Sequence, residues 1–274
     1  MEYIKAEGKY PVVIKADGLA LGKGVLICEN EEQAAEGVKE IMLDKKFGAS
    51  GNHVVVEEFL TGPEVSVLSF TDGKVVKPMV SSMDHKRAND HDTGLNTGGM
   101  GTVAPNPYYT PAIAAECMEK IFLPTIKAMN AEGCPFKGCL YFGLMLTPDG
   151  PKVIEYNCRF GDPETQVVLP LLEGDLLHIM EACTNGTLAD EDVKFSDGAA
   201  ACVILASGGY PVAYEKGKPI SGLVDGQLPD EENVTVYHSG TALTEDGTLV
   251  TNGGRVLGVT ATGPRLTNAP EPRL

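Results

Sequence analysis

Short apolar runs, rich in β-branched residues, recur along the chain between turns that contain glycine, proline or aspartate. This pattern is typical of strands, which need only a few residues each. The runs Val12–Lys15 and Gly24–Cys28 flank a glycine-rich turn and predict a β-hairpin. Three further runs in close succession, HVVVEEFL, EVSVLSF and KVVKPMV, predict an antiparallel meander.

Two other segments have the apolar spacing of an amphipathic helix. Asn30 can cap the first, with Gln33 three residues later as a capping box, and the helix is expected to end near Leu43. Its buried side chains are expected to be Ala34, Val38, Ile41 and Met42. Thr110, followed by a proline, marks the start of a second helix over residues 111–130.

The other segments of the chain predict strands, a helical region and a long loop. CLYFGLMLT and PKVIEYN predict a hairpin that turns at residues 148–150, and a helical region from Glu164 to Thr184, broken at Pro170, follows it. From Ala199 onward, apolar strands alternate with glycine turns. Residues 81–107 instead form a long polar, glycine-rich stretch without periodicity, which is typical of a functional loop.

This succession of helices and strands predicts an α/β (α+β) fold. A polar, turn-rich run places a domain boundary near Val193. The expected divisions are a first domain over residues 1–193 with subdomains 1–60 and 61–193, a β-rich domain over residues 194–266, and an unstructured tail over residues 267–274.

Composition and charge narrow the function. The 274 residues are 43% hydrophobic, enough for a large core, and 32 glycines favour many tight turns over a helical bundle. A formal net charge of -16 argues against nonspecific binding to nucleic acid or anionic membranes. The seven cysteines form no CxxC pair, and there is no leader or long apolar span, so we expect a soluble, cytoplasmic protein with reduced thiols.

The segment VIEYNCRFGDPETQ, residues 153–166, carries the clearest chemistry. Glu155 and Asn157 are two apart on an expected strand, so their oxygens face the same way and can share a hard cation. The turn that follows presents Arg159, whose guanidinium group can bind a carboxylate or a phosphate. The alternative is an ordinary half-buried strand and turn. Cys158 is expected to be a small buried residue and not a nucleophile.

Two earlier segments suit a nucleotide. The turn GLALGKG, residues 18–24, lets phosphates approach the backbone and carries Lys23, with Lys15 on the strand before it. It is neither a Walker motif nor GxGxxG, and its alternative is a plain hairpin turn with solvated lysines. The strand end Glu57–Leu60, with Glu64 just beyond, could take a base and a ribose, or simply expose its glutamates.

Together, VVIKADGLALGKGV, VVVEEFLTGPEVS, DHKRANDHDTGLNTGGMG and VIEYNCRFGDPETQ resemble the phosphoribosylamine–glycine ligase family, also called glycinamide ribonucleotide synthetases, of the ATP-grasp superfamily. The resemblance covers roughly residues 1–263, and NTGGMG and RFGDPETQ are characteristic of this family. It implies an ATP-grasp fold of two α+β subdomains with a β-rich C-terminal domain. It also implies the ligation of glycine to 5-phosphoribosylamine in purine (IMP) biosynthesis. In that reaction the glycine carboxylate attacks the γ-phosphate of ATP, and the amine then displaces phosphate from glycyl phosphate.

The resemblance also implies roles for individual residues. ATP is expected to bind at Lys15, Gly22, Lys23, Gly24, Glu57, Glu58, Phe59, Leu60 and Glu64. Glu155 and Asn157 are expected to hold Mg²⁺, with Mn²⁺ as an alternative. The substrates are expected to contact Asp84, His85, Lys86, Arg87, Asn96, Thr97, Gly98, Gly99, Met100, Arg159, Gly161, Asp162, Pro163 and Glu164. Arg159, Lys23 and Asp162 are expected to be catalytic, because phosphoryl transfer needs charge neutralisation and positioning.

The sequence departs from the family at three places. The family has a further N-terminal domain before the strand that carries Lys15, and it continues beyond RVLGVTATG, so we expect a chain truncated at both ends. Leu95 stands where the family usually has proline. The alternatives are a nucleotide-binding fragment without turnover and an ATP-grasp ligase for another acceptor. We expect a monomer whose partners are glycine and 5-phosphoribosylamine, with no nucleic acid or membrane partner.

Overall fold

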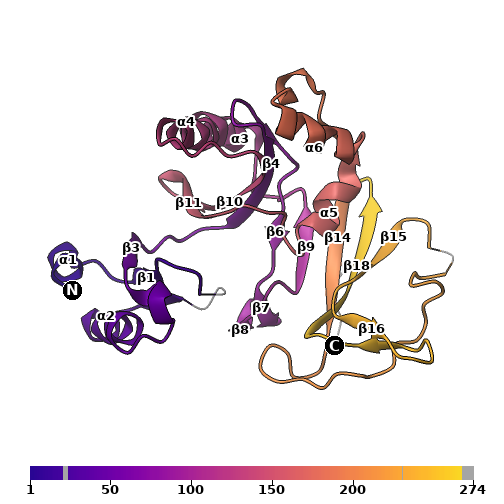
Figure 1. Ribbon diagram of the computed structural model, residues 1–274, viewed down its shortest axis with the longest axis horizontal. Helices are drawn as coiled ribbons and strands as arrows, with labels where there is room; N and C mark the ends of the chain where they lie inside the picture. Colours follow the sequence, from indigo (N-terminus) through magenta and orange to yellow (C-terminus); the bar gives the residue numbers. More distant parts are fainter. Residues whose placement is uncertain (21–23, 230, 267–274) are drawn as a thin grey trace. The chain divides into compact units, whose positions relative to one another are not determined.

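The computed structural model describes residues 1–20, 24–229 and 231–266 (Figure 1). The chain divides into two compact units, Met1–Thr61 (unit 1) and Gly62–Leu274 (unit 2), and each is described by itself. The predicted tail over residues 267–274 lies outside the described residues.

Unit 1 is a three-stranded antiparallel sheet with helices on one face. The strand order is β2-β1-β3, with β1 (Val12–Ala16), β2 (Val25–Cys28) and β3 (Val54–Glu58). The helices are α1 (Glu2–Glu7) and α2 (Glu31–Val38), and α2 continues into a π-helical turn (Lys39–Leu43), with a short 3₁₀ turn (Gly48–Gly51) after it. Ile14 of β1 is fully buried against Ala34 and Ile41 of these helices, so the core of unit 1 lies between the sheet and its helices.

The predicted elements of unit 1 are confirmed. β1 and β2 form the expected hairpin, with Val13 opposite Ile27. The Asn30 side chain accepts a hydrogen bond from the Gln33 backbone N–H at 3.0 Å, which satisfies one of the free N–H groups of the helix start. In a capping box the Gln33 side chain would accept from the N–H of Asn30. Here it accepts from the N–H of Glu29, one residue earlier.

The predicted meander is confirmed for its second and third strands, which pair antiparallel, but it is wrong for the first strand. β3 pairs with β1, where Val56 lies opposite Ile14, whereas β4 (Glu64–Thr71) pairs with β5 (Val76–Pro78) and with β10 (Gly138–Thr147). Strands that follow one another in sequence often pair, but here β3 completes the core of unit 1 and β4 becomes a central strand of unit 2. Burial explains the separation, because β4 is buried at every position after Glu64 and needs a core on both faces.

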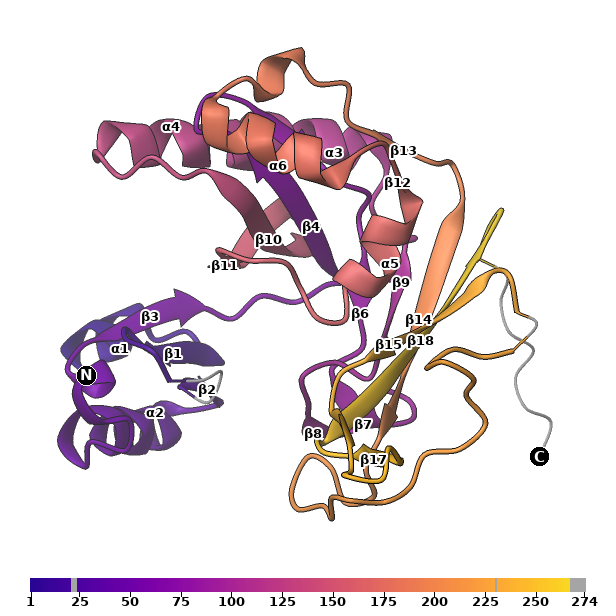
Figure 2. The same ribbon diagram turned by 45° about the vertical axis from the view of Figure 1, so that its right-hand side comes forward.

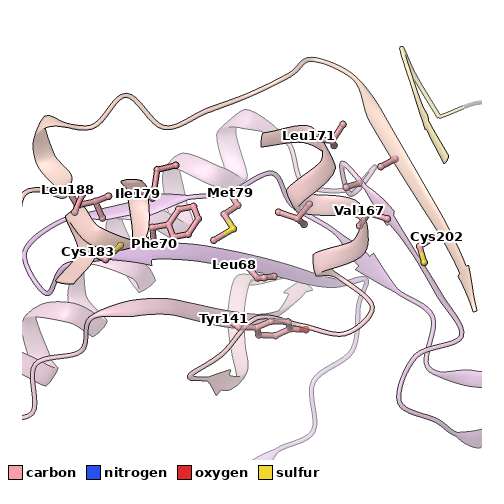
Figure 3. Close-up of a cluster of buried hydrophobic side chains, with 14 of the residues drawn as sticks. Leu68, Phe70, Met79, Tyr141, Val167, Leu171, Ile179, Cys183, Leu188 and Cys202 are labelled. Carbon is pink, nitrogen blue, oxygen red and sulfur yellow. The ribbon is translucent and has the colours of Figure 1, made fainter. Parts of the chain in front are cut away.

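Unit 2 begins with a four-stranded sheet in the order β11-β10-β4-β5, in which β11 spans Gly150–Asn157. One face packs on α3 (Pro111–Cys117), a π-helical turn (Met118–Phe122) and α4 (Leu123–Ala131), which realise the helix predicted over residues 111–130. The other face packs on α5 (Thr165–Val168), the 3₁₀ turns Leu169–Leu171 and Leu188–Asp190, and α6 (Leu176–Asn185). Figure 3 shows this second core, where Phe70, Met79 and Ile179 lie together.

A second sheet of unit 2 joins distant parts of the chain. Its order is β15-β18-β14-β9-β6, and its strands are β6 (Met83–Asp84), β9 (Gly101–Ala104), β14 (Ala199–Ala206), β15 (Val234–His238) and β18 (Arg255–Gly263). Figure 2 shows β14 and β18 side by side, with β9 and β6 following beyond β14. The sheet therefore contains residues from both sides of Val193, and the predicted domain boundaries stay a prediction.

Short strand pairs complete unit 2. They are β7 (Arg87–Asn89) with β8 (Thr93–Asn96), β12 (Leu172–Glu173) with β13 (Lys194–Phe195), and β16 (Thr241–Leu243) with β17 (Leu249–Thr251). The polar stretch 81–107, predicted as a loop, thus contains four short strands, whose pairing a lack of apolar periodicity cannot reveal. The α/β class predicted from the sequence is confirmed. Across residues 1–20, 24–229 and 231–266, no helix is both long and apolar enough to span a membrane.

Candidate functional site

The face of the unit 1 sheet that its helices do not cover is apolar and exposed. Val25, Ile27 and Val55 are 47%, 54% and 42% exposed, although β-branched side chains normally pack against neighbours. Lys15 lies directly opposite Val25 and Val55, and its Nζ is 2.5 Å from Oε2 of Glu57 on the same face. These five residues form the open face of unit 1, in which Lys15 of the central strand lies between Val25 and Val55.

Gly18 and Gly24, the first and last residues of the glycine-rich turn, are closely packed. A Cβ atom on Gly18 would lie 2.6 Å from Cα of Ser50, and one on Gly24 would lie 2.6 Å from Cβ of Ala20. Both positions therefore need glycine for reasons of space. Gly22 and Lys23, predicted to contact ATP phosphates, lie outside the described residues.

The predicted hinge for the nucleotide base lies at the end of β3. Glu58 is exposed, whereas Phe59 and Leu60 are half-buried. Glu64, predicted to take the ribose, belongs to unit 2, where its Oε2 is 2.7 Å from Nζ of Lys86. The nucleotide roles of these residues stay predictions.

Unit 2 contains a pocket of about 110 Å³ that we call the small pocket. It is lined by Asp84, Lys86, Thr97, Gly98, Tyr141, Glu155, Asn157, Arg159, Asp162 and Glu164. Nine of these ten residues were predicted from the sequence as metal or substrate residues, and they come from segments far apart along the chain. The fold therefore gathers the two most distinctive sequence motifs around one small space.

The expected metal pair lies on one face of β11. The Asn157 side-chain amide donates to Oε1 of Glu155 at 3.0 Å, and Nη2 of Arg159 donates to Oδ1 of Asn157 at 3.4 Å. An amide can be turned over to direct its oxygen to the neighbouring carboxylate, so the pair offers the oxygen donors that Mg²⁺ prefers. In the described part of the chain, no cluster of three or more His, Cys, Asp or Glu could hold a metal. A cation at this pair would therefore need ligand oxygens as well, which phosphates supply.

Glu164 and Asp84 are two further carboxyl groups that line the small pocket. Glu164 is only 4% exposed, and its Oε1 accepts a hydrogen bond from the Tyr141 hydroxyl at 2.9 Å. Burial and then the charge of Glu164 raise the pKa of Asp84 to about 7. Burial and Glu164 also raise the pKa of Tyr141, which stays protonated and so remains a donor.

Lys86 supplies positive charge near these carboxyl groups. Burial alone would lower its pKa, but the neighbouring Glu64, Asp84 and Glu155 outweigh burial and raise the pKa of Lys86. Lys86 therefore stays charged at neutral pH and can attract an anionic ligand into the small pocket.

Two glycines of the predicted substrate motifs let the backbone lie against these carboxyl groups. Gly99 has a φ of +110°, and a Cβ atom there would lie 2.6 Å from Oδ1 of Asp84 and 2.5 Å from Cδ of Pro163. A Cβ atom on Gly161 would lie 2.3 Å from Oε2 of Glu164. The glycines of NTGGMG and RFGDPE are thus required by the packing around the small pocket.

Some predicted substrate residues do not line the small pocket. Arg87 and Asn96 face each other in the β7–β8 hairpin, and Arg87 donates to the Gly94 carbonyl at 2.9 Å. His85 and Met100 are joined to each other by a backbone hydrogen bond. Contacts of these four side chains with a substrate stay predictions.

The sequence reasoning missed four residues of this region. Ser66 and Tyr141 share a buried hydrogen bond of 2.6 Å, and Tyr210 and Arg255 contact Gly98. Each of the four is a single polar residue in an otherwise apolar or glycine-rich run, and this was the only sign of a role in the sequence. A larger hollow of about 720 Å³ adjoins Asp162 and is lined by Gly161, Asp162, Thr165, Gln166, Leu169, Tyr237, His238, Ser239, Gly240 and Arg255.

The chain is similar to known proteins along most of its length. The family model described as phosphoribosylglycinamide synthetase, ATP-grasp (A) domain, matches residues 1–165, and the model for the C domain of the same synthetase matches residues 200–272. The phosphoribosylamine–glycine ligase of Vibrio vulnificus is 47% identical over 270 residues, which are 98% of this chain and 62% of that protein. The trifunctional purine biosynthetic protein adenosine-3 of Gallus gallus is 51% identical over 91% of this chain and 25% of that protein.

A solved structure is also similar to this chain. The crystal structure of phosphoribosylamine–glycine ligase from Thermotoga maritima superposes with a TM-score of 0.84 and 39% identity, over 96% of this chain and 64% of that chain. This chain thus spans less than two thirds of the length of each of these three relatives.

Proposed function

The chain belongs to the phosphoribosylglycinamide synthetase family, a family of ATP-grasp ligases, and from this premise we propose that it joins glycine to 5-phosphoribosylamine. The products are glycinamide ribonucleotide, ADP and phosphate, in purine (IMP) biosynthesis. The observation that carries the proposal is the small pocket. It brings the NTGGMG and RFGDPE motifs together with the metal pair and with charged groups of both signs.

The open face of unit 1 supports the assignment of the nucleotide. A flat face of exposed β-branched residues suits the apolar ring of a nucleotide base, whose burial removes apolar surface from water. Lys15, between Val25 and Val55, suits phosphate oxygens, since an ammonium group is a compact point charge. Lys23 has the same chemistry in the adjoining turn.

The metal pair supports a divalent cation. Glu155 and Asn157 would hold Mg²⁺, or Mn²⁺, because their donor atoms are oxygens on one strand face. The ion would supply positive charge that neutralises phosphate oxygens during phosphoryl transfer. Arg159, which already donates to Asn157, lies where it can add its own charge beside the pair.

The remaining residues of the small pocket suit glycine. The glycine carboxylate needs positive partners, which Arg159 and Lys86 provide. The glycine ammonium group needs negative partners, which Glu164 and Asp84 provide. Tyr141 keeps Glu164 in place through its hydrogen bond, and the reaction needs no covalent enzyme intermediate.

The proposal includes a monomeric, cytoplasmic enzyme without a nucleic acid partner. The charge of -16 supports the absence of nucleic acid binding, and no disulfide forms among the seven cysteines, all of which lie in the described part of the chain. A nucleotide-binding protein without turnover is the second candidate, because the chain spans 62% of the Vibrio vulnificus ligase.

An assay of ADP release separates the two candidates. The purified chain is mixed with ATP, Mg²⁺, glycine and freshly generated 5-phosphoribosylamine, and nucleotide binding is titrated in parallel. The proposal predicts ADP formation that requires both cosubstrates, is lost in Asn157→Ala and is kept in Asn185→Ala, which changes an exposed residue at the end of α6. Nucleotide binding without ADP formation would favour the second candidate, and the absence of both would refute both.

A further inference from the structure

Arg255, the first residue of β18, reaches two turns that lie far from it in sequence. One guanidinium nitrogen, Nη1, donates to the Gly98 carbonyl at 2.7 Å and to the Asp162 carbonyl at 2.9 Å. The other, Nη2, lies 3.2 Å from Oδ2 of Asp162. The side chain is only 20% exposed, so its charge is partly removed from water and is compensated by these contacts.

Tyr210 holds the same turn from its other side. Its hydroxyl oxygen accepts a hydrogen bond from the Gly98 N–H at 2.9 Å. The ring can lie there because residue 254 is glycine, where a Cβ atom would be 2.2 Å from Cδ2 of Tyr210. The N–H and the carbonyl of Gly98 are therefore both bound by side chains from the last third of the chain.

These contacts bear directly on the small pocket. Gly98 and Asp162 both line it, and they belong to the two turns that carry the glycine-rich substrate motifs. The two turns lie against each other where Gly99 meets Pro163, and Arg255 adds hydrogen bonds to both of them. A planar guanidinium group can serve several oxygens at once, which a lysine ammonium on a flexible stem cannot do in the same geometry.

We propose that Arg255, assisted by Tyr210, is a positioning residue that fixes the separation of the Gly98 and Asp162 turns and thereby the width of the small pocket. The guanidinium group is directed at chain oxygens, so it acts on substrates through the turns and not by contact. The kinetic part of this inference rests on the proposed ligase function, whereas its structural part does not. A displacement of about 1 Å in such turns costs about 10²-fold in rate.

Amide hydrogen exchange tests the structural part without any substrate. In Arg255→Ala, peptides that cover residues 96–101 and 160–166 are expected to exchange faster than in the wild type, because both turns lose their common anchor. In Tyr210→Phe, only the first peptide is expected to exchange faster. The matched control is Arg265→Ala, which removes an exposed arginine. Unchanged exchange in both peptides of Arg255→Ala would overturn the inference.

Steady-state kinetics test the positioning role. Arg255→Ala is expected to lose about 10²-fold in kcat/KM for glycine and the amine, with the KM for ATP unchanged. Added guanidinium ion is expected to restore part of the activity of Arg255→Ala. Arg255→Lys is expected to be only slightly more active than Arg255→Ala. If Arg255→Ala is too unstable at the assay temperature, Tyr210→Phe and Arg255→Lys decide the point. Faster exchange with an unchanged kcat/KM for glycine would overturn the positioning role. A wild type without ADP formation would refute the proposed function, while the exchange experiment would still decide the structural part.

Discussion

The open face of unit 1 and the small pocket of unit 2 are two different kinds of candidate site. The open face consists of residues on three adjacent strands, and their positions follow from the alternation of side chains in a sheet. The small pocket draws its ten lining residues from several strands and turns of unit 2, and most of these residues are polar or charged. The first is suited to a flat apolar ring, and the second to small charged groups in fixed positions. We therefore expect substitutions in the open face to weaken nucleotide binding gradually and those in the small pocket to abolish turnover.

The largest effect is expected from Glu155→Gln in the small pocket. The change removes the carboxylate of the metal pair but keeps the size of the side chain, so turnover is expected to fall by about 10³-fold. Nucleotide binding measured without divalent cation is expected to be unchanged, because that binding is assigned to unit 1.

The control for this substitution is Glu119→Gln, at an exposed position beside α3. Equal losses of turnover and of metal-free nucleotide binding in Glu155→Gln would show that the two sites are not separate in function.

The next effect concerns the dependence of stability on pH. The pKa of Asp84 is raised from 3.8 to about 7, so the folded chain holds this proton more tightly than the unfolded chain. The stabilisation is fully present below about pH 4 and is lost as the pH rises towards 7. The free energy of unfolding of the wild type should therefore fall, relative to Asp84→Asn, by up to about 4 kcal/mol between these pH values.

Denaturant titrations at several pH values measure this difference in the absence of divalent cations. Asp149→Asn, in the exposed turn between β10 and β11, is the control and is expected to follow the wild type. A parallel course of the wild type and Asp84→Asn would mean that Asp84 is hydrated in the small pocket.

A smaller effect is expected from Gly99→Ala. Its φ of +110° is strained for alanine, and the new methyl group would meet Asp84 and Pro163 at 2.6 and 2.5 Å. We expect a loss of about 2–3 kcal/mol in the free energy of unfolding together with a raised KM for glycine. Gly133→Ala also has a positive φ but nothing within 4 Å, and it is expected to cost about 1 kcal/mol without any change in KM.

The smallest effect is expected in the open face. Ile27→Ser removes an exposed apolar side chain from the surface assigned to the base, so affinity for ATP should fall about tenfold, corresponding to about 1.4 kcal/mol. The KM for glycine is expected to be unchanged. Val203→Ser, at another exposed strand position, is the control and is expected to leave both values unchanged. Unaltered ATP affinity in Ile27→Ser would remove the open face from the nucleotide site.

The same two regions show how far the sequence could predict the structure. The β1–β2 hairpin and the Asn30 helix cap were predictable because their determinants are local. The shared face of Glu155 and Asn157 followed from strand periodicity alone. The pairing of β3 with β1, by contrast, depends on which core its valines complete, and this is a tertiary choice.

The missed residues illustrate the same limit. Tyr141 and Arg255 are single polar residues in apolar runs, and only the folded chain brings them to Glu164 and to the Gly98 turn. The β9 strand was missed because its pairing with β14 involves residues about one hundred positions apart, which no local pattern encodes, and the two-residue strand β6 pairs only with β9.

We propose that glycine is activated as glycyl phosphate before the amine attacks it. The most direct test supplies glycine labelled with ¹⁸O in its carboxylate, together with ATP, Mg²⁺ and 5-phosphoribosylamine, and analyses the released phosphate by mass spectrometry. One ¹⁸O atom is expected in each phosphate, because a carboxylate oxygen bonds to the γ-phosphorus and leaves with it when the amine attacks the carbonyl carbon. Released phosphate without ¹⁸O would contradict the claim, since the γ-phosphate would then have been transferred to water.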